Sequence, residues 1–210
     1  RGAFCTHLFG LFRTEPGSER HKGLTYLLVP LDLPGTTVRG FGRLDGDEGF
    51  QDAVKMARFC AGALSIDEAQ VLVASTGVIG RKFPVDRVAG SVSRLVKGLS
   101  PGGIPEAAEA IMTTDRYPKI QYREGPVGGS DVCVCGIAKG AGMIEPGMAT
   151  LLAFILTDAD IDDQAMRRAL RDAVDQSFNA ISVDGCMSTN DTVIILANGK
   201  AGNRPLTESS

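Results

Sequence analysis

The chain has 210 residues, of which 43% are hydrophobic and 22% charged, and its formal net charge is −3. This length can bury one substantial core or two small ones, and the charge balance offers no basic surface for nucleic acid. The longest apolar run, residues 151–156, is far shorter than the roughly 20 residues of a membrane helix. We therefore expect a globular protein without nucleic acid or membrane as a partner.

The five cysteines are odd in number and lack the paired C-x-x-C spacing of a zinc site, so no metal is expected. Cys133 and Cys135 alternate, so their side chains share one face of a strand, where we expect a buried structural role. Reduced cysteines and the lack of a recognisable secretory signal favour the cytoplasm, or an organelle matrix.

In the first half of the chain, hydrophobic spacing predicts alternating strands and helices. Strands are expected at 24–29 and 70–74, and a helix at 50–64 with one apolar face formed by Phe50, Ala53, Val54, Ala57, Ala61 and Leu64. Valines at helical spacing predict a second helix from 85 to 99, which Ser-Pro-Gly-Gly at 100–103 ends. Pro105 is expected in the first turn of a short helix through Met112.

The second half continues this alternation. Strands are expected at 133–137, 150–157 and 193–197, and a helix at 162–178 with Met166, Leu170, Ala173 and Val174 facing inward. The acidic run 158–163 lacks the glycine and final glutamate of a calcium loop, and it favours a charged helix start instead. Such alternation favours an α+β protein with layers of sheet and helix.

The junction between Ala149 and Thr150 has the features of a self-cleavage site. A run rich in glycine and containing proline, residues 139–148, leads to a hydroxyl that precedes an apolar strand. If Thr150 attacked the carbonyl of Ala149, the ester so formed would hydrolyse and leave threonine as a new first residue. Its own α-amine, with an unperturbed pKa of roughly 7.7–8, could then serve as the general base. The alternative is that Thr150 merely opens a strand and the glycines form its turn.

Three further segments resemble a known family. They are Val71 to Gly80, a buried strand that runs into a glycine turn; Ala110 to Asp115; and Ser188 to Thr192, a polar loop before a strand. Together with residues 139–150, they resemble the ornithine acetyltransferase (glutamate N-acetyltransferase) family of arginine biosynthesis over about residues 46–197.

The resemblance implies a role for each matching residue. Ala149 would end an α chain, and Thr150 would begin a β chain and act as the nucleophile. Thr76 and Gly77 would form the oxyanion hole. Lys139 and one threonine of the pair Thr113 and Thr114 would bind substrate together with Thr150; the sequence leaves open which of the two makes the contact.

The implied reaction is the transfer of acetyl from N2-acetylornithine to glutamate through an acetyl-threonine intermediate. No cofactor is required, although some family members accept acetyl-CoA as donor. The resemblance also implies two mixed β-sheets packed face to face with helices outside, and a homo-oligomer of α/β heterodimers in the complete enzyme.

The two ends of the chain depart from the family. Residues 1–50 resemble part of the middle β-domain of acyl-CoA dehydrogenases, but the flavin-contacting strand of those enzymes is missing, so FAD is not expected. The expected divisions are a dehydrogenase-like segment at 1–46, an α-chain-like part at 47–149 and the start of a β-chain-like part at 150–210. Substrate-contacting residues later in the family have no counterpart here, so we expect an incomplete site, exposed apolar sheet surface and a tendency to associate.

Two other functions remain open. The chain could be an N-terminal-nucleophile amidohydrolase or aminopeptidase, in which water replaces glutamate as acceptor. It could also be a catalytically inactive fusion fragment. Asn190 and Asp191, in the polar loop, could either hold ammonium or carboxylate groups of a substrate or cap and turn the chain before its strand.

Overall fold

Two β-sheets organise the chain. The computed structural model describes residues 9–10, 27–30, 46–76, 83–142, 151–183 and 191–209, with side chains from residue 48 onward. A three-stranded antiparallel sheet contains β1 (Phe9–Gly10), β2 (Leu27–Pro30) and β3 (Val71–Ala74) in that order. A four-stranded sheet contains β4 (Lys119–Val127), β5 (Ser130–Lys139), β6 (Leu152–Thr157) and β7 (Thr192–Ala197) in that order.

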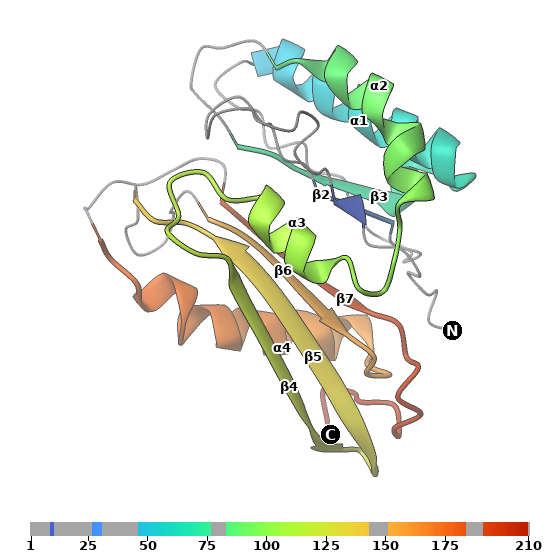
Figure 1. Cartoon of the computed structure of the whole chain (residues 1–210). Coiled ribbons are helices and arrows are strands. Elements are labelled where there is room, and N and C mark those ends of the chain that lie inside the picture. Colours follow the sequence, from blue (N-terminus) through green and yellow to red (C-terminus); the bar gives the residue numbers. More distant parts are fainter. Residues whose placement is uncertain are drawn as a thin grey trace.

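The helices lie mainly on the outer faces of the two sheets, as Figure 1 shows. Helices α1 (Gly46–Leu64) and α2 (Val85–Lys97) cover the smaller sheet, and α4 (Asp163–Asp175) lies along the far face of the larger one. Short helix α3 (Ile104–Ala110) stands beside β5, with Pro105 in its first turn as predicted. Two single 3₁₀ turns, η1 (Glu68–Gln70) and η2 (Phe178–Ala180), precede β3 and follow α4.

Strand β3 separates two hydrophobic clusters because its side chains alternate between the faces of the sheet. Val71 packs with α1 and α2 in the outer cluster, whereas Leu72 and Ala74 pack with α3 and the four-stranded sheet in the inner one. The inner cluster includes Leu152 and Phe154 of β6. The sheets therefore face one another with helices outside, which confirms the predicted α+β architecture.

The four-stranded sheet is mixed. Strands β4, β5 and β6 are antiparallel neighbours, and β6 runs parallel to β7. A parallel pair needs a long crossover, and α4 provides it. Asp162 begins α4 as its N-cap, accepting a hydrogen bond from the amide of Ala165 at 2.7 Å, as the acidic run predicted.

Several details differ from the sequence prediction. The buried face of α1 is centred on Met56, Ala57, Cys60 and Ala61, and Phe50 is exposed. In α4 the buried residues are Ala165 and Met166, while Ala173 is exposed. Cys133 and Cys135 are half-buried rather than buried. The apolar pattern predicted the positions of these helices correctly. It predicted the wrong side of each helix as buried, because the pattern does not reveal where the neighbouring sheet lies.

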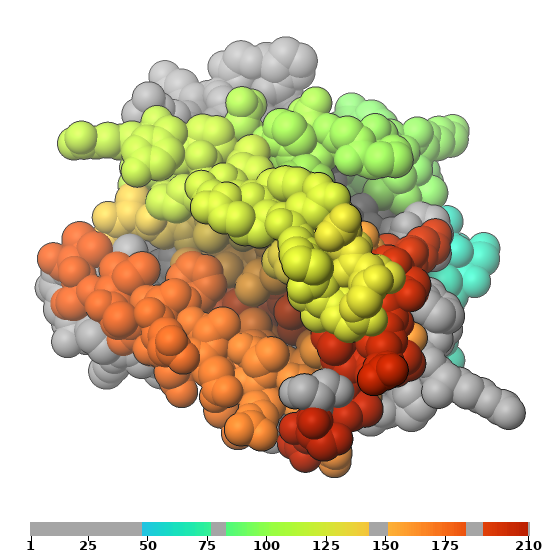
Figure 2. Space-filling view, turned by 90° about the horizontal axis from the view of Figure 1, so that it is seen from below, coloured from blue at the N-terminus to red at the C-terminus, as the bar shows by residue number. Residues whose placement is uncertain are grey.

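Side chains at the tip of the β4–β5 hairpin border a hollow of about 850 Å³. In Figure 2 it lies between the yellow hairpin, the orange α4 and the red C-terminal segment. Across the part of the chain that the structure describes, no helix is long and apolar enough to cross a membrane.

Candidate active site

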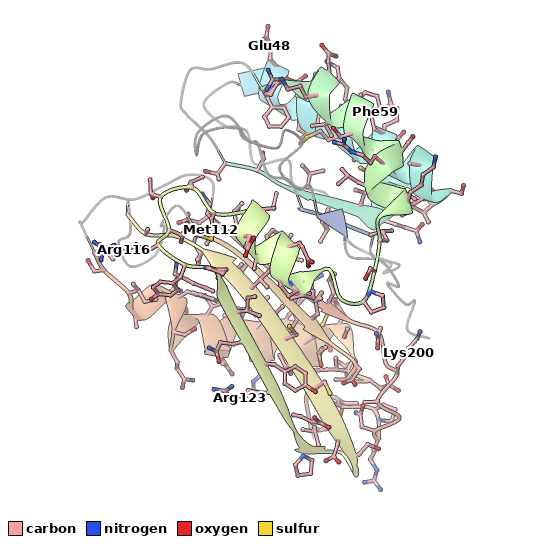
Figure 3. The ribbon with its side chains drawn as sticks, viewed as in Figure 1. Glu48, Phe59, Met112, Arg116, Arg123 and Lys200 are labelled. Atoms are coloured by element: carbon pink, nitrogen blue, oxygen red, sulfur yellow. The ribbon has the colours of Figure 1, made fainter. Side chains whose placement is uncertain are left out.

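Three strand ends and one loop meet at the same end of the larger sheet. Lys139, the last residue of β5, pairs with Leu152, the first residue of β6. Leu152 in turn pairs with Thr192, which begins β7. The loop that follows α3 reaches this end of the sheet; Figure 3 labels Met112 and Arg116, which flank its central part. The sheet therefore brings together segments far apart in the sequence.

Lys139 lies at the centre of this region, with only 2% of its surface exposed. Its Nζ donates a hydrogen bond to Oγ1 of Thr113 at 3.3 Å. Burial lowers the pKa of the Lys139 ammonium, while the charges of Asp115 and Asp191 oppose that change and Lys119 adds to it. A buried ammonium with one neutral partner is suited to holding an anionic group or to donating a hydrogen bond.

Asp115 anchors the loop to the sheet. It is buried, and its carboxylate accepts hydrogen bonds from the Lys119 ammonium, from the Gly140 amide at 2.9 Å and from the Thr113 amide at 3.3 Å. Burial opposes ionisation, but these donors outweigh it, and the pKa of Asp115 falls below its usual value. Because Asp115 binds the Thr113 amide, it also fixes the hydroxyl that contacts Lys139.

Asp191 directly precedes the first residue of β7. Its Oδ1 accepts a hydrogen bond from the Leu151 amide at 2.7 Å. Its Oδ2 is buried and has no hydrogen-bond partner among the described residues. Burial raises the pKa of Asp191 to about 6, against the opposing effects of the Leu151 amide and the Lys139 charge.

The structure places some of the predicted residues and leaves others undescribed. Ala149, Thr150, Gly77 and Asn190 lie outside the described residues. Thr76 is half-buried two residues after β3, whose last residue, Ala74, belongs to the same inner cluster as Leu152.

The structure distinguishes the two threonines that follow α3. Thr113 contacts Lys139 through its hydroxyl, which singles it out from Thr114 as the threonine joined to the lysine. Whether either threonine touches substrate stays a prediction.

The sequence did not reveal the full roles of two carboxylates in this region. The role of Asp115 was missed, although its position directly after the threonine pair and four residues before Lys119 was a usable signal. Asp191 was considered for substrate binding or local turning, but its carboxylate binds a backbone amide 40 residues away. Within the described ranges, no group of three or more histidine, cysteine, aspartate or glutamate residues could hold a metal ion.

Solved structures share this architecture. The arginine biosynthesis bifunctional protein ArgJ of Bacillus halodurans superimposes with a TM-score of 0.51 at 22% identity, over 68% of this chain and 91% of that one. The L-aminopeptidase D-Ala-esterase/amidase of Ochrobactrum anthropi, a variant of the Ntn hydrolase fold, gives a TM-score of 0.50 at 12% identity, over 98% of this chain and 77% of that one. Both structures share the fold described above, in which two β-sheets face one another.

Sequence comparison identifies the family. The model of the ArgJ family matches residues 43–210, and the chain belongs to that family. The arginine biosynthesis bifunctional protein ArgJ of Geobacter sulfurreducens is 52% identical over 165 residues, which are 79% of this chain and 42% of that protein. The chain therefore spans well under half the length of this curated relative. The family match does not reach residues 1–42, so the dehydrogenase resemblance there stays a prediction.

Proposed function

We propose that the chain is part of an acetyltransferase that moves acetyl from N2-acetylornithine to glutamate through Thr150, after cleavage between Ala149 and Thr150. The observation that carries this proposal is the meeting of Lys139, Thr113 and the start of β6 at one sheet end. Thr150 lies two residues before β6 in the sequence, which supports a joint role for the lysine and the threonine. Family membership supports the same reaction.

The proposed cleavage is an acyl shift followed by hydrolysis. The Thr150 hydroxyl oxygen attacks the Ala149 carbonyl carbon, the C–N bond breaks, and the nitrogen takes up the proton that the hydroxyl loses, which gives the new α-amine. Water then opens the Ala149 ester, giving a carboxylate on Ala149 and restoring the hydroxyl. The products are an α chain ending at Ala149 and a β chain beginning at Thr150.

The two halves of the acetyl transfer would both use the hydroxyl and the α-amine of Thr150. The α-amine of Thr150 takes the hydroxyl proton as the oxygen attacks the acetyl carbonyl of N2-acetylornithine. Ornithine leaves with a proton, and the α-amino group of glutamate then attacks the acetyl ester and restores the hydroxyl. The hydroxyl or amide of Thr76 and the amide of Gly77 would stabilise the oxyanion, and Lys139 with Thr113 would hold a carboxylate of the substrate.

A hydrolytic function is the second candidate. The likeness to the Ochrobactrum enzyme, an L-aminopeptidase and D-Ala-esterase/amidase, favours it. In that case water would accept the acyl group in place of glutamate. Formation of N-acetylglutamate separates the two functions, because a hydrolase would release acetate alone.

The proposal extends to assembly and location. We assign residues 47–149 to the α chain and residues 150–210 to the beginning of the β chain, with 1–46 as a separate segment. The complete enzyme would be a homo-oligomer of such heterodimers in the cytoplasm or an organelle matrix, without a cofactor.

The test is to trap the acetyl-enzyme. Purified chain, with the family's C-terminal segment supplied in trans, is incubated with N2-acetylornithine without glutamate, and the fragments are analysed by mass spectrometry. The expected result is one added acetyl group on the fragment that begins at Thr150, removed on addition of glutamate. Thr76→Ala should reduce the rate of acetylation by about 10²-fold if its hydroxyl stabilises the oxyanion. Acetylation at another residue, or none on the cleaved chain, would contradict the transferase.

A further inference from the structure

Two lysines lie at the same end of the larger sheet, and they have different partners. Lys119, the first residue of β4, forms an ion pair with Asp115. Lys139 forms an ion pair with no carboxylate among the residues that the structure describes, and its Nζ donates to the hydroxyl of Thr113 instead. The lysines are near one another because Lys119 pairs with Ala138, the residue before Lys139.

Asp115 is linked to Lys139 through two other residues. Its carboxylate accepts hydrogen bonds from the Thr113 amide at 3.3 Å and from the Gly140 amide at 2.9 Å. Gly140 directly follows Lys139 in the chain, and the hydroxyl of Thr113 accepts from the Lys139 Nζ at 3.3 Å. A long and flexible lysine side chain this close could turn to the carboxylate if Lys119 were absent.

The ion pair with Lys119 makes that turn unnecessary. The side chain of Asp115 is 1% exposed, so its charge needs a counter-charge in the fold. Lys119 supplies it from a side chain that is 37% exposed, with Nζ 5.6 Å from the centre of the Tyr117 ring. With one ammonium and two amides bound, the carboxylate has its donors without Lys139.

We propose that Lys119 is a positioning residue for the substrate site: by occupying Asp115, it keeps the Lys139 ammonium free of a carboxylate partner and available to a carboxylate of the substrate. This inference rests on the proposed function, in which Lys139 and Thr113 hold that group. An ammonium already paired with Asp115 would have to break the pair before binding an anion. Because Thr113 is exposed, the ammonium that it contacts lies close to the surface.

The charges that act on Lys139 come from three places in the fold: Asp115 in the loop after α3, Lys119 in β4 and Asp191 before β7. Burial lowers the pKa of Lys139, the two carboxylates raise it, and Lys119 lowers it further. Loss of Lys119 removes a repulsion and leaves Asp115 to Lys139, so the pKa of Lys139 should rise. Loss of the Asp115 charge should lower it. A purely stabilising role of Lys119 predicts neither change.

The first test is an NMR titration of the Lys139 ammonium in chains made with isotope-labelled lysine. All chains carry Thr150→Ala so that cleavage does not intervene, and the signal is assigned by its loss in Lys139→Arg. The midpoint should rise by about one pH unit in Lys119→Met and fall by about one pH unit in Asp115→Asn. Lys119→Arg, which keeps the ion pair, should restore the original midpoint. A midpoint that does not rise in Lys119→Met overturns the inference; Lys119→Gln replaces this variant, with the same expected direction, if it does not fold.

Lys55→Met is the matched control. Lys55 of α1 forms an ion pair with the buried Asp52 at 3.0 Å, three residues away in the same helix. Its loss should leave the Lys139 midpoint unchanged, because neither Lys55 nor Asp52 is among the charges that act on Lys139. Equal shifts in Lys55→Met and Lys119→Met would show a general effect of losing a lysine and would overturn the inference.

The second test measures ligand binding by titration calorimetry to the same Thr150→Ala chains, with the family's C-terminal segment supplied in trans. Lys119→Met should bind N2-acetylornithine about tenfold more weakly. N-acetyl-1,4-diaminobutane, the same molecule without its carboxylate, should bind equally with and without Lys119. Unchanged affinity for N2-acetylornithine, or an equal loss for both ligands, overturns the inference. If the chain that retains Lys119 does not prefer N2-acetylornithine, the proposed function is contradicted, and the Lys139 titration alone decides the role of Lys119.

Discussion

Lys139 is the residue on which the electrostatics of the site depend. It is buried at the end of β5, and two carboxylates, those of Asp115 and Asp191, act on its ammonium. A buried cation of this kind is costly in isolation and is stable only with such partners. Its removal leaves Asp191 without the cation that acts on it, while Asp115 keeps its ion pair with Lys119.

Lys139→Met should therefore lower the free energy of unfolding by about 2 kcal/mol, because it removes the hydrogen bond to Thr113 and the cation that acts on the buried carboxylate of Asp191. The measurement is urea denaturation in a Thr150→Ala background, which keeps the chain intact. Arg167→Met is the control, because Arg167 pairs with Asp163 at 2.8 Å while 60% of its side chain is exposed. That variant should cost less than about 1 kcal/mol. Equal losses would contradict a special role for burial.

Asp191 gives the site a pH dependence of definite sign. Its pKa is about 6 in the fold against an ordinary 3.8, so the folded state binds the proton more tightly than the unfolded chain. Stability contributed by this group is present at low pH and is lost as pH rises from about 4 to about 6. Asp115, whose pKa is lowered, has the opposite effect, which is lost as pH falls.

Asp191→Asn should remove the loss of stability that occurs as the pH rises from about 4 to about 6. We expect the stability of the wild-type chain, relative to Asp191→Asn, to fall between pH 4 and pH 6, with both chains carrying Thr150→Ala. Urea midpoints at a series of pH values measure the difference, and the contribution of Asp115 cancels because it is common to both. A difference that does not change with pH would show that Asp191 titrates normally.

At the scale of elements, the β4–β5 hairpin depends on two glycines. Gly128 and Gly129 have φ values of +60° and +92°, as the two-residue turn of a hairpin requires. A Cβ on Gly128 would lie 2.9 Å from the Arg204 carbonyl oxygen, whereas one on Gly129 would meet nothing within 4 Å. The C-terminal segment is thus packed against one glycine and not the other.

Gly128→Ala should destabilise the chain more than Gly129→Ala. Both substitutions carry a backbone penalty of about 1 kcal/mol, but only the first also displaces Arg204, whose amide donates to the Gly128 carbonyl at 2.9 Å. We expect a total loss of about 2 to 3 kcal/mol for Gly128→Ala by thermal or urea unfolding. The reverse order would mean that the C-terminal segment does not pack on the turn.

Buried elements were easier to predict from the sequence than exposed ones. The valines of α2 are buried at Val85, Val88 and Val92, so their helical spacing was a reliable signal. Strand β4 was missed because it is an edge strand, half-buried at best, whose charged residues, together with Gly125 and Pro126, hide any alternation. Strand β5 was predicted, but its predicted length was too short, since only its apolar centre forms a recognisable pattern in the sequence.

The candidate site shows a similar limit. Lys139 and the threonine pair came from the family resemblance, and the choice of Thr113 required a distance. The bonds of Asp115 to Gly140 and of Asp191 to Leu151 join residues 25 and 40 positions apart. No local pattern encodes such pairings, because they arise only when the sheet brings β5, β6 and β7 into register.

At the scale of the whole molecule, the described strands form the facing sheets of the family fold while the chain covers 42% of the Geobacter relative. Apolar side chains remain exposed on the larger sheet, among them Tyr122, Val127 and Val134. This agrees with the expected exposure of apolar sheet surface. The expected tendency to associate stays a prediction.

Self-cleavage before Thr150 is the step on which the proposed acetyl transfer depends, because cleavage frees the α-amine that would act as general base. Intact mass of the purified chain, with N-terminal sequencing of any smaller species, tests it most directly. The account predicts a fragment beginning Thr150-Leu151-Leu152, absent in Thr150→Ala. A single uncleaved chain of 22.1 kDa, stable for days, would contradict the account and favour an inactive fusion fragment.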